Sequence, residues 1–81
     1  NMNAYYNYAL MLQQEGRNVE SIKVVENGLQ LFVNNERLLY VQLLGEINTK
    51  NNNALNTCSL LLQLAPNNQD YQKIYRDLKQ N

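Results

Sequence analysis

Few side chains in this chain could carry out chemistry. Cys58 is the single cysteine and histidine is absent, so neither a nucleophile–base pair nor the usual ligand sets for zinc can be assembled. Glu15, Glu20 and Glu26 lie at no useful spacing from a base or a metal-ligating side chain, and no glycine-rich phosphate loop is present. We therefore predict that the protein is not an enzyme and uses no metal and no cofactor.

The charge balance narrows the class of partner. Seven Lys and Arg balance seven Asp and Glu, and only 17% of the 81 residues are charged, so the chain lacks the basic surface that binds nucleic acid. No apolar run approaches the ~20 residues that cross a bilayer. We expect a protein or peptide partner, no nucleic acid and no membrane insertion. The compartment stays open, with the cytoplasm as the default and the periplasm as an alternative.

Amide side chains supply most of the polarity, with 15 Asn and 8 Gln. Asparagine is a favourable residue at the start of a helix. We predict that helices are capped by the asparagines that stand where the hydrophobic pattern breaks, namely Asn18, Asn35, Asn51 and Asn67 or Asn68. Cys58 lies among leucines, which favours a small buried hydrophobic residue over a reactive thiol.

The sequence repeats itself with an offset of 33 residues, so that Gly16 aligns with Thr49 and Leu29 aligns with Leu62. Apolar residues within each segment recur at spacings of three and four, which is typical of helices and not of strands. The predicted helices span about residues 3–15, 19–32, 36–48, 53–64 and 68–79. The small residues Ser21 and Gly28 indicate where another helix approaches closely.

A common pattern of large and small residues runs through these helices. Its first copy reads Tyr5, Tyr8, Ala9, Leu12, Ser21 and Val25, its second Leu38, Val41, Gly45, Ala54, Cys58 and Pro66, and its half copy Tyr71, Ile74, Tyr75 and Leu78. In spacing this pattern resembles the tetratricopeptide repeat (TPR) family over nearly all of residues 3–80. Gly45 stands where the family prefers a bulky aromatic residue, and we expect Leu61 to fill the volume that it leaves.

The resemblance implies an all-α fold in which antiparallel helical hairpins stack as a right-handed α-solenoid of five helices. It divides the single domain, residues 1–81, into a first repeat at 3–34, a second repeat at 35–67 and a capping helix at 68–80. We expect this domain to be part of a longer chain.

The first predicted helix is apolar around nearly its whole circumference from Ala4 to Leu12. This pattern is typical of a helix that is covered on several sides, yet a helix that stands first should have one side uncovered. Three explanations remain open: further repeats upstream, self-association through this helix as a homo-oligomer, or a peptide ligand bound there.

In the family that the chain resembles, the first helix of each hairpin lines a concave groove. The resemblance implies a partner-binding groove made by Asn3, Tyr6, Leu10, Gln13, Glu36, Leu39, Leu43, Glu46, Gln72, Arg76 and Lys79. The apolar part of this surface would suit an extended segment or a short helix. The alternative is that these side chains only complete the packing between helices.

These features predict a protein–protein interaction scaffold that binds a peptide or helix segment of a partner in the groove. The alternative is an oligomerisation or spacer module, which positions neighbouring domains and self-associates through the first helix. The lack of histidine favours either function over catalysis.

Overall fold

The computed structural model describes residues 1–80, in which five α-helices are joined by short turns and no strand occurs. The helices are α1 Met2–Gln14, α2 Asn18–Leu31, α3 Glu36–Asn48, α4 Ala54–Leu64 and α5 Gln69–Gln80. The predicted all-α class and the five helices are confirmed, and each predicted boundary lies within one residue of the observed one. Asn81 lies outside the described residues.

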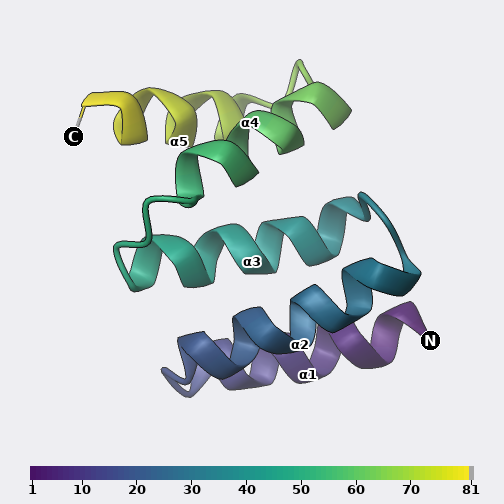
Figure 1. The fold of residues 1–81 in the computed structure, drawn as a ribbon. Coiled ribbons are helices and arrows are strands. Elements are labelled where there is room, and N and C mark those ends of the chain that lie inside the picture. The colour runs from purple at the N-terminus through teal and green to yellow at the C-terminus, as the bar shows by residue number, and fades with distance from the viewer. Residues whose placement is uncertain (81) are drawn as a thin grey trace.

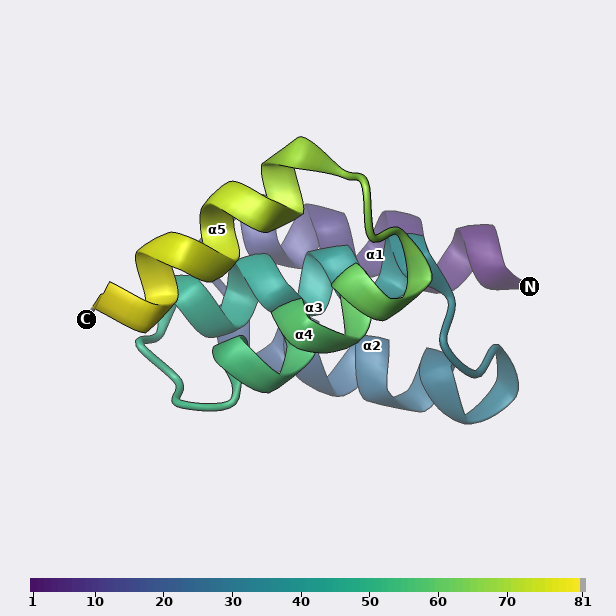
Figure 2. The same cartoon turned by 90° about the horizontal axis from the view of Figure 1, so that it is seen from above.

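Consecutive helices run antiparallel and lie side by side from α1 through α5 (Figure 1). α1 also packs against α3, whereas α5 approaches only α4 closely along its backbone within residues 1–80. Seen from above, α1 and α5 lie on one side of α3, and α2 and α4 lie on the other (Figure 2). α3 is therefore the central helix.

Two clusters of buried side chains form the core, and α3 contributes to both. The cluster between α1, α2 and α3 consists of Ala9, Val25, Leu38 and Val41. The cluster between α3, α4 and α5 consists of Leu39, Leu43, Ala54, Cys58, Leu61 and Tyr71. Each fully buried leucine contributes about 2 kcal/mol relative to an exposed one, so burial on both sides fixes α3 firmly.

Asparagine side chains start three of the helices. Oδ1 of Asn1, Asn35 and Asn68 accepts a hydrogen bond from the backbone N–H three residues later, at 2.9, 3.1 and 3.0 Å. Each bond satisfies a donor that the helix leaves unpaired, which typically contributes ~1 kcal/mol. The predicted caps at Asn35 and Asn68 are confirmed, and Asn1 adds a third.

The predicted caps at Asn18 and Asn51 are wrong. Arg17 occupies the N-cap position of α2 without a side-chain capping bond, and Asn18 donates through Nδ2 to the carbonyl oxygen of Gly16. Asn53 is the N-cap of α4, again without a side-chain capping bond, and Oδ1 of Asn51 accepts from the backbone N–H of Asn53 inside the turn. Both amides therefore shape turns instead of capping helices.

A residue in the left-handed conformation follows both α1 and α3. Gly16 has a φ of 80°, as expected of a glycine that ends a helix, and Lys50 has a φ of 55°. The next N–H in each case returns to the helix, from Arg17 to Leu12 and from Asn51 to Glu46, both at 2.8 Å. Glycine adopts this conformation freely, whereas lysine does so at a cost of roughly 1 kcal/mol.

Small residues let the first three helices approach closely. Ser21 is fully buried, and its Oγ donates to the carbonyl oxygen of Ala9 at 2.7 Å. A Cβ atom on Gly28 would lie 3.0 Å from Tyr5 and 3.2 Å from Leu38. The predicted role of Ser21 and Gly28 is confirmed.

Gly45 brings α3 equally close to α2. A Cβ atom there would lie 3.1 Å from Cγ1 of Ile22 and 3.6 Å from the carbonyl oxygen of Asn18. Leu61 lies instead in the cluster between α3, α4 and α5. The prediction that Leu61 fills this volume is wrong, because Ile22 of the preceding helix occupies it.

One side of α1 is uncovered. Tyr8 is 50% exposed and Met11 is 42% exposed, and Ala4 and Asn7 on the same side are exposed as well. Tyr8, whose spacing predicts a place on the core stripe of α1, therefore faces away from the core.

Candidate functional site

Four of the predicted groove residues belong to α1 and border α3. Oδ1 of Asn3 accepts a hydrogen bond from Arg37 of α3 at 3.3 Å, and the guanidinium of Arg37 lies 4.1 Å from the centre of the Tyr6 ring. Tyr6, Leu10 and Gln13 are half-buried. Because a cation is attracted to the face of an aromatic ring, Arg37 holds Tyr6 in place near the start of both helices.

Three of the predicted α3 residues lie in the interior. Leu39, Leu43 and Glu46 are 4%, 0% and 2% exposed, so a partner has no access to these side chains in this fold. These three side chains complete the packing between helices, which is the alternative to a role in the groove. Glu36 is exposed, and its Oε2 accepts a hydrogen bond from the phenol of Tyr71 at 2.7 Å.

The number of residues between successive helix starts explains why the predicted α1 residues are accessible while three predicted α3 residues are buried. Asn1 and Asn35, which cap α1 and α3, are 34 residues apart, whereas Asn35 and Asn68, which cap α3 and α5, are 33 apart. A shift of one residue turns an α-helix by about 100°. Aligning Asn1 with Asn35 gives an offset of 34 residues between α1 and α3. With this offset, Asn3, Tyr6, Leu10 and Gln13 of α1 correspond to Arg37, Tyr40, Leu44 and Ile47 of α3.

We call the resulting surface the α1–α3 face. It consists of Asn3, Tyr6, Leu10 and Gln13 from α1 and Arg37, Tyr40, Leu44 and Ile47 from α3. Each set has the spacing i, i+3, i+7, i+10, which places its members on one side of a helix. All eight residues are exposed or half-buried, so this face offers tyrosine and aliphatic side chains beside a single arginine.

The predicted α5 residues lie on another side of the molecule. With the 33-residue spacing, Gln72, Arg76 and Lys79 correspond to the three buried residues of α3, at positions that face the next helix pair. No helix within residues 1–80 follows α5, so Arg76 and Lys79 are exposed. Gln72 donates to the carbonyl oxygen of Pro66 at 2.9 Å, and the Lys79 amine lies 5.6 Å from the Tyr75 ring. These residues form the outer surface of α5.

A buried polar network joins α3 to α4. Oε2 of Glu46 accepts hydrogen bonds from Nδ2 of Asn53 at 2.7 Å and from Nε2 of Gln42 at 3.1 Å. Gln42 also donates to Oγ1 of Thr57 at 3.2 Å. Oε1 of Glu46 is buried without a hydrogen-bond partner among the described residues. Sequence reasoning missed this network because glutamate in a helix is normally exposed.

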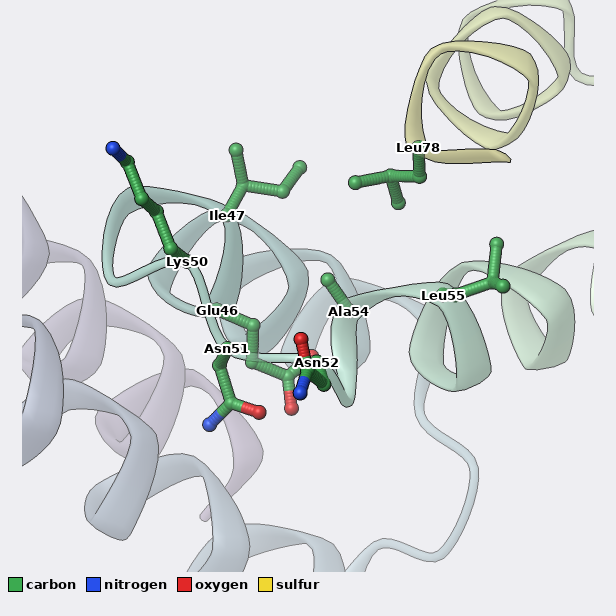
Figure 3. Close-up of a pocket in the computed structure, with 8 residues that line it drawn as sticks. All are labelled: Glu46, Ile47, Lys50, Asn51, Asn52, Ala54, Leu55 and Leu78. Atoms are coloured by element: carbon green, nitrogen blue, oxygen red, sulfur yellow. The ribbon is translucent and has the colours of Figure 1, made fainter. Parts of the chain in front are cut away.

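An open cavity of about 540 Å³ lies where α3 ends, α4 begins and α5 ends (Figure 3). Side chains from three helices surround it, since Ile47, Leu55 and Leu78 stand around the opening. The residues that line it are Glu46, Ile47, Lys50, Asn51, Asn52, Ala54, Leu55 and Leu78. Ile47 also belongs to the α1–α3 face, so the cavity continues that face at the end of α3.

Cys58 is fully buried, as predicted, and its Sγ lies 3.4 Å from the carbonyl oxygen of Tyr71. Burial raises the pKa of the Cys58 thiol, which keeps it protonated and unreactive. In the described part of the chain, no three His, Cys, Asp or Glu side chains gather where they could hold a metal ion.

No helix within residues 1–80 is both long enough and apolar enough to cross a membrane. No family model, curated protein or solved structure matches the chain.

Proposed function

We propose that the protein is a TPR-like, right-handed α-solenoid that works as a protein–protein interaction scaffold. It binds a peptide or a helix segment of a partner protein on the α1–α3 face. The observation that carries this proposal is the half-buried apolar strip formed by Tyr6, Leu10, Tyr40 and Leu44, with Arg37 at one end.

The repetition of local structure supports the solenoid. α1 and α3 have 13 residues each, and each begins with an asparagine whose side chain accepts from the N–H three residues later. α5 begins in the same way at Asn68. Stacked helices of one type are the arrangement in which such repeats bury a continuous core.

The composition of the α1–α3 face supports peptide binding. Tyrosine and arginine are enriched among the residues that dominate binding energies at protein interfaces. The helices that carry them pack on a core, so this surface needs little ordering when a partner binds. Asn3 and Gln13 supply amides for the backbone of a bound segment, and Arg37 favours an acidic residue in it.

Peptides selected from a random displayed library for binding to the protein would test this proposal. We expect Tyr6→Ala and Leu44→Ala each to weaken the selected peptides at least about tenfold, as truncation of a central interface residue commonly does. Leu31→Ala is the matched control, because Leu31 is an exposed apolar residue on α2. Peptides whose affinity is unchanged by Tyr6→Ala and Leu44→Ala but lowered by Leu31→Ala would overturn the assignment of binding to the α1–α3 face.

A second candidate function is self-association through the uncovered side of α1, in a module that positions neighbouring domains. A shallow hollow of about 300 Å³ lies there, lined by Ala4, Tyr5, Tyr8, Val24 and Asn27. The corresponding side of α3 carries Leu38 and Val41, which are buried against α1 and α2. An uncovered apolar surface of this kind favours contact with another protein chain.

A further inference from the structure

The cavity at the end of α3 lies where the junction of α4 with α5 differs in sequence from the junction of α2 with α3. Gly45 lets α3 approach Ile22 of α2, where an added Cβ atom would lie only 3.1 Å from that side chain. At the corresponding position α5 carries Leu78, and the counterpart of Ile22 in α4 is Leu55. Leu78 and Leu55 both line the cavity, so two branched side chains stand where the first junction has one.

The other end of α5 is held close to α3. The phenol of Tyr71 donates to Glu36 at 2.7 Å, and the rings of Tyr71 and Tyr40 lie 5.9 Å apart. The two helices meet through side chains at their starts and have no close backbone contact. The cavity lies at their other ends, beside Ile47 and Leu78. Its volume of about 540 Å³ falls within the range of sites that hold ligands.

The exposed charged group at this cavity is the amine of Lys50, whereas the carboxylate of Glu46 is buried. Glu46 and Lys50 are the charged residues that line the cavity. Oε2 of Glu46 is bonded to Asn53 and Gln42 and its Oε1 is buried, whereas Lys50 is exposed and extends outward from the turn (Figure 3). The start of α4, which lacks a side-chain cap, adds the partial positive charge of a helix N-terminus.

We propose that this cavity receives a bulky apolar side chain of the bound peptide and that Lys50 pairs with a carboxylate next to that side chain. The inference rests on the proposed function, because Ile47 joins the cavity to the α1–α3 face. Ile47, Leu55 and Leu78 contact the apolar group, and Lys50 selects a segment in which an acidic residue accompanies it.

A small molecule with both chemical features tests the cavity without a partner protein. The probe is 4-phenylbutyrate, followed through the NMR signals of the Ile47, Leu55 and Leu78 methyl groups in the intact chain. We expect these signals to shift with a dissociation constant on the order of 1 mM, which is reasonable for a ligand of this size. The comparison compound is 4-phenylbutylamine, which has a similar skeleton and the opposite charge, and which should bind more weakly.

Variants then assign the binding to the named residues. Lys50→Glu should weaken 4-phenylbutyrate about fivefold or more, while Lys23→Glu, at an exposed lysine of α2, should leave it unchanged. Leu55→Trp should fill the cavity and abolish the shifts of the Ile47 and Leu78 methyl signals. If circular dichroism shows that this variant is unfolded, Leu55→Phe is used in its place.

Three results would each overturn the inference: methyl signals that do not respond to the probe, an amine that binds as tightly as the carboxylate, or binding that survives the filling of the cavity. If the selected peptides lose affinity with Tyr6→Ala but not with Lys50→Glu, the role of the cavity is refuted while binding on the α1–α3 face stands. Peptides that depend on neither residue, beside a probe that still binds the cavity, would remove the proposed groove function and leave a site for small apolar acids.

Discussion

The phenolic oxygen of Tyr71 in α5 lies 2.7 Å from Oε2 of Glu36 in the first turn of α3. This hydrogen bond fastens the start of the last helix to the start of the central one, beside the contact between the Tyr71 and Tyr40 rings. Because the acceptor is a carboxylate, the bond is of the stronger, charge-assisted kind.

The first prediction concerns the pH dependence of stability. Burial and the hydrogen bond to Glu36 raise the pKa of Tyr71 above its ordinary value of 10.0. A raised pKa in the folded state means that the contribution of this group is present below about pH 10 and is lost as the pH rises through the folded-state pKa. We expect Tyr71→Phe to lower the free energy of unfolding by about 1–2 kcal/mol at pH 7, and the difference from wild type to shrink above pH 10.

Urea unfolding between pH 7 and about pH 11 would measure this difference. Tyr8→Phe is the control, since Tyr8 is half exposed. A Tyr71→Phe variant whose deficit stays constant across that range would contradict the assignment.

The second prediction concerns Gly28. Alanine is the better helix former by about 1 kcal/mol, but its Cβ atom would lie 3.0 Å from Cγ of Tyr5 and 3.2 Å from Leu38. Overpacking of this kind commonly costs about 1–3 kcal/mol, so we expect Gly28→Ala to destabilise the protein on balance, by about 1 kcal/mol. Gly45→Ala is the comparison, because its neighbour Ile22 is half-buried and can move aside. Equal losses in chemical denaturation would argue against this reading of the two glycines.

The third prediction separates the charge of Glu46 from its hydrogen bonds. Glu46→Ala would leave the amides of Asn53 and Gln42 without their shared acceptor, and we expect a loss of about 2–4 kcal/mol. Glu46→Gln keeps an acceptor and removes a buried charge whose second oxygen has no hydrogen-bond partner in the described residues. Its stability should lie within about 1 kcal/mol of wild type. A glutamine variant as unstable as the alanine variant would show that the charge itself is needed.

The fourth prediction tests the uncovered side of α1. If this surface mediates self-association, the mass of the wild-type protein in solution should rise with concentration up to about 1 mM, as measured by sedimentation. Tyr8→Lys combined with Met11→Lys should keep the protein monomeric, whereas Val19→Lys at an exposed position of α2 should not. A wild-type protein that is monomeric throughout would count against self-association.

The fifth prediction concerns Lys50, whose φ of 55° suits glycine better than lysine. Lys50→Gly should raise the free energy of unfolding by about 0.5–1 kcal/mol, measured in urea. The same variant should lose affinity for 4-phenylbutyrate. A gain in stability together with undiminished binding would separate the backbone effect from the proposed charge pair and refute the latter.

Much of the fold follows from local sequence signals. The hydrophobic period placed all five helices, and Asn35, Asn68 and Gly16 have side-chain or backbone preferences strong enough to mark helix ends. Asn18 and Asn51 carry the same signal without acting as caps, because an amide beside a turn can bond to the turn itself.

The candidate site was less predictable because it depends on single-residue register. Periodicity cannot separate an offset of 33 from one of 34 while the turns vary in length, and the choice decides whether Leu39 or Tyr40 is assigned to the accessible face. The buried Glu46 accepts hydrogen bonds from Asn53 in the turn before α4 and from Gln42 of α3, and this convergence depends on the tertiary fold. The cavity depends on two leucines that meet across a helix junction, a contact that no local pattern indicates.

The hydrogen bond of α5 at Tyr71 and the open cavity beside Leu78 also bear on how the helix responds to force. A load on the last turn of α5, directed away from α4, would part its contacts one after another from Leu78 toward Tyr71, as a zipper opens. A load along the helix axis would have to shear those contacts together, which requires a larger force. We therefore expect α5 to detach at a lower force when its Leu78 end is pulled away from α4 than when it is pulled along its axis.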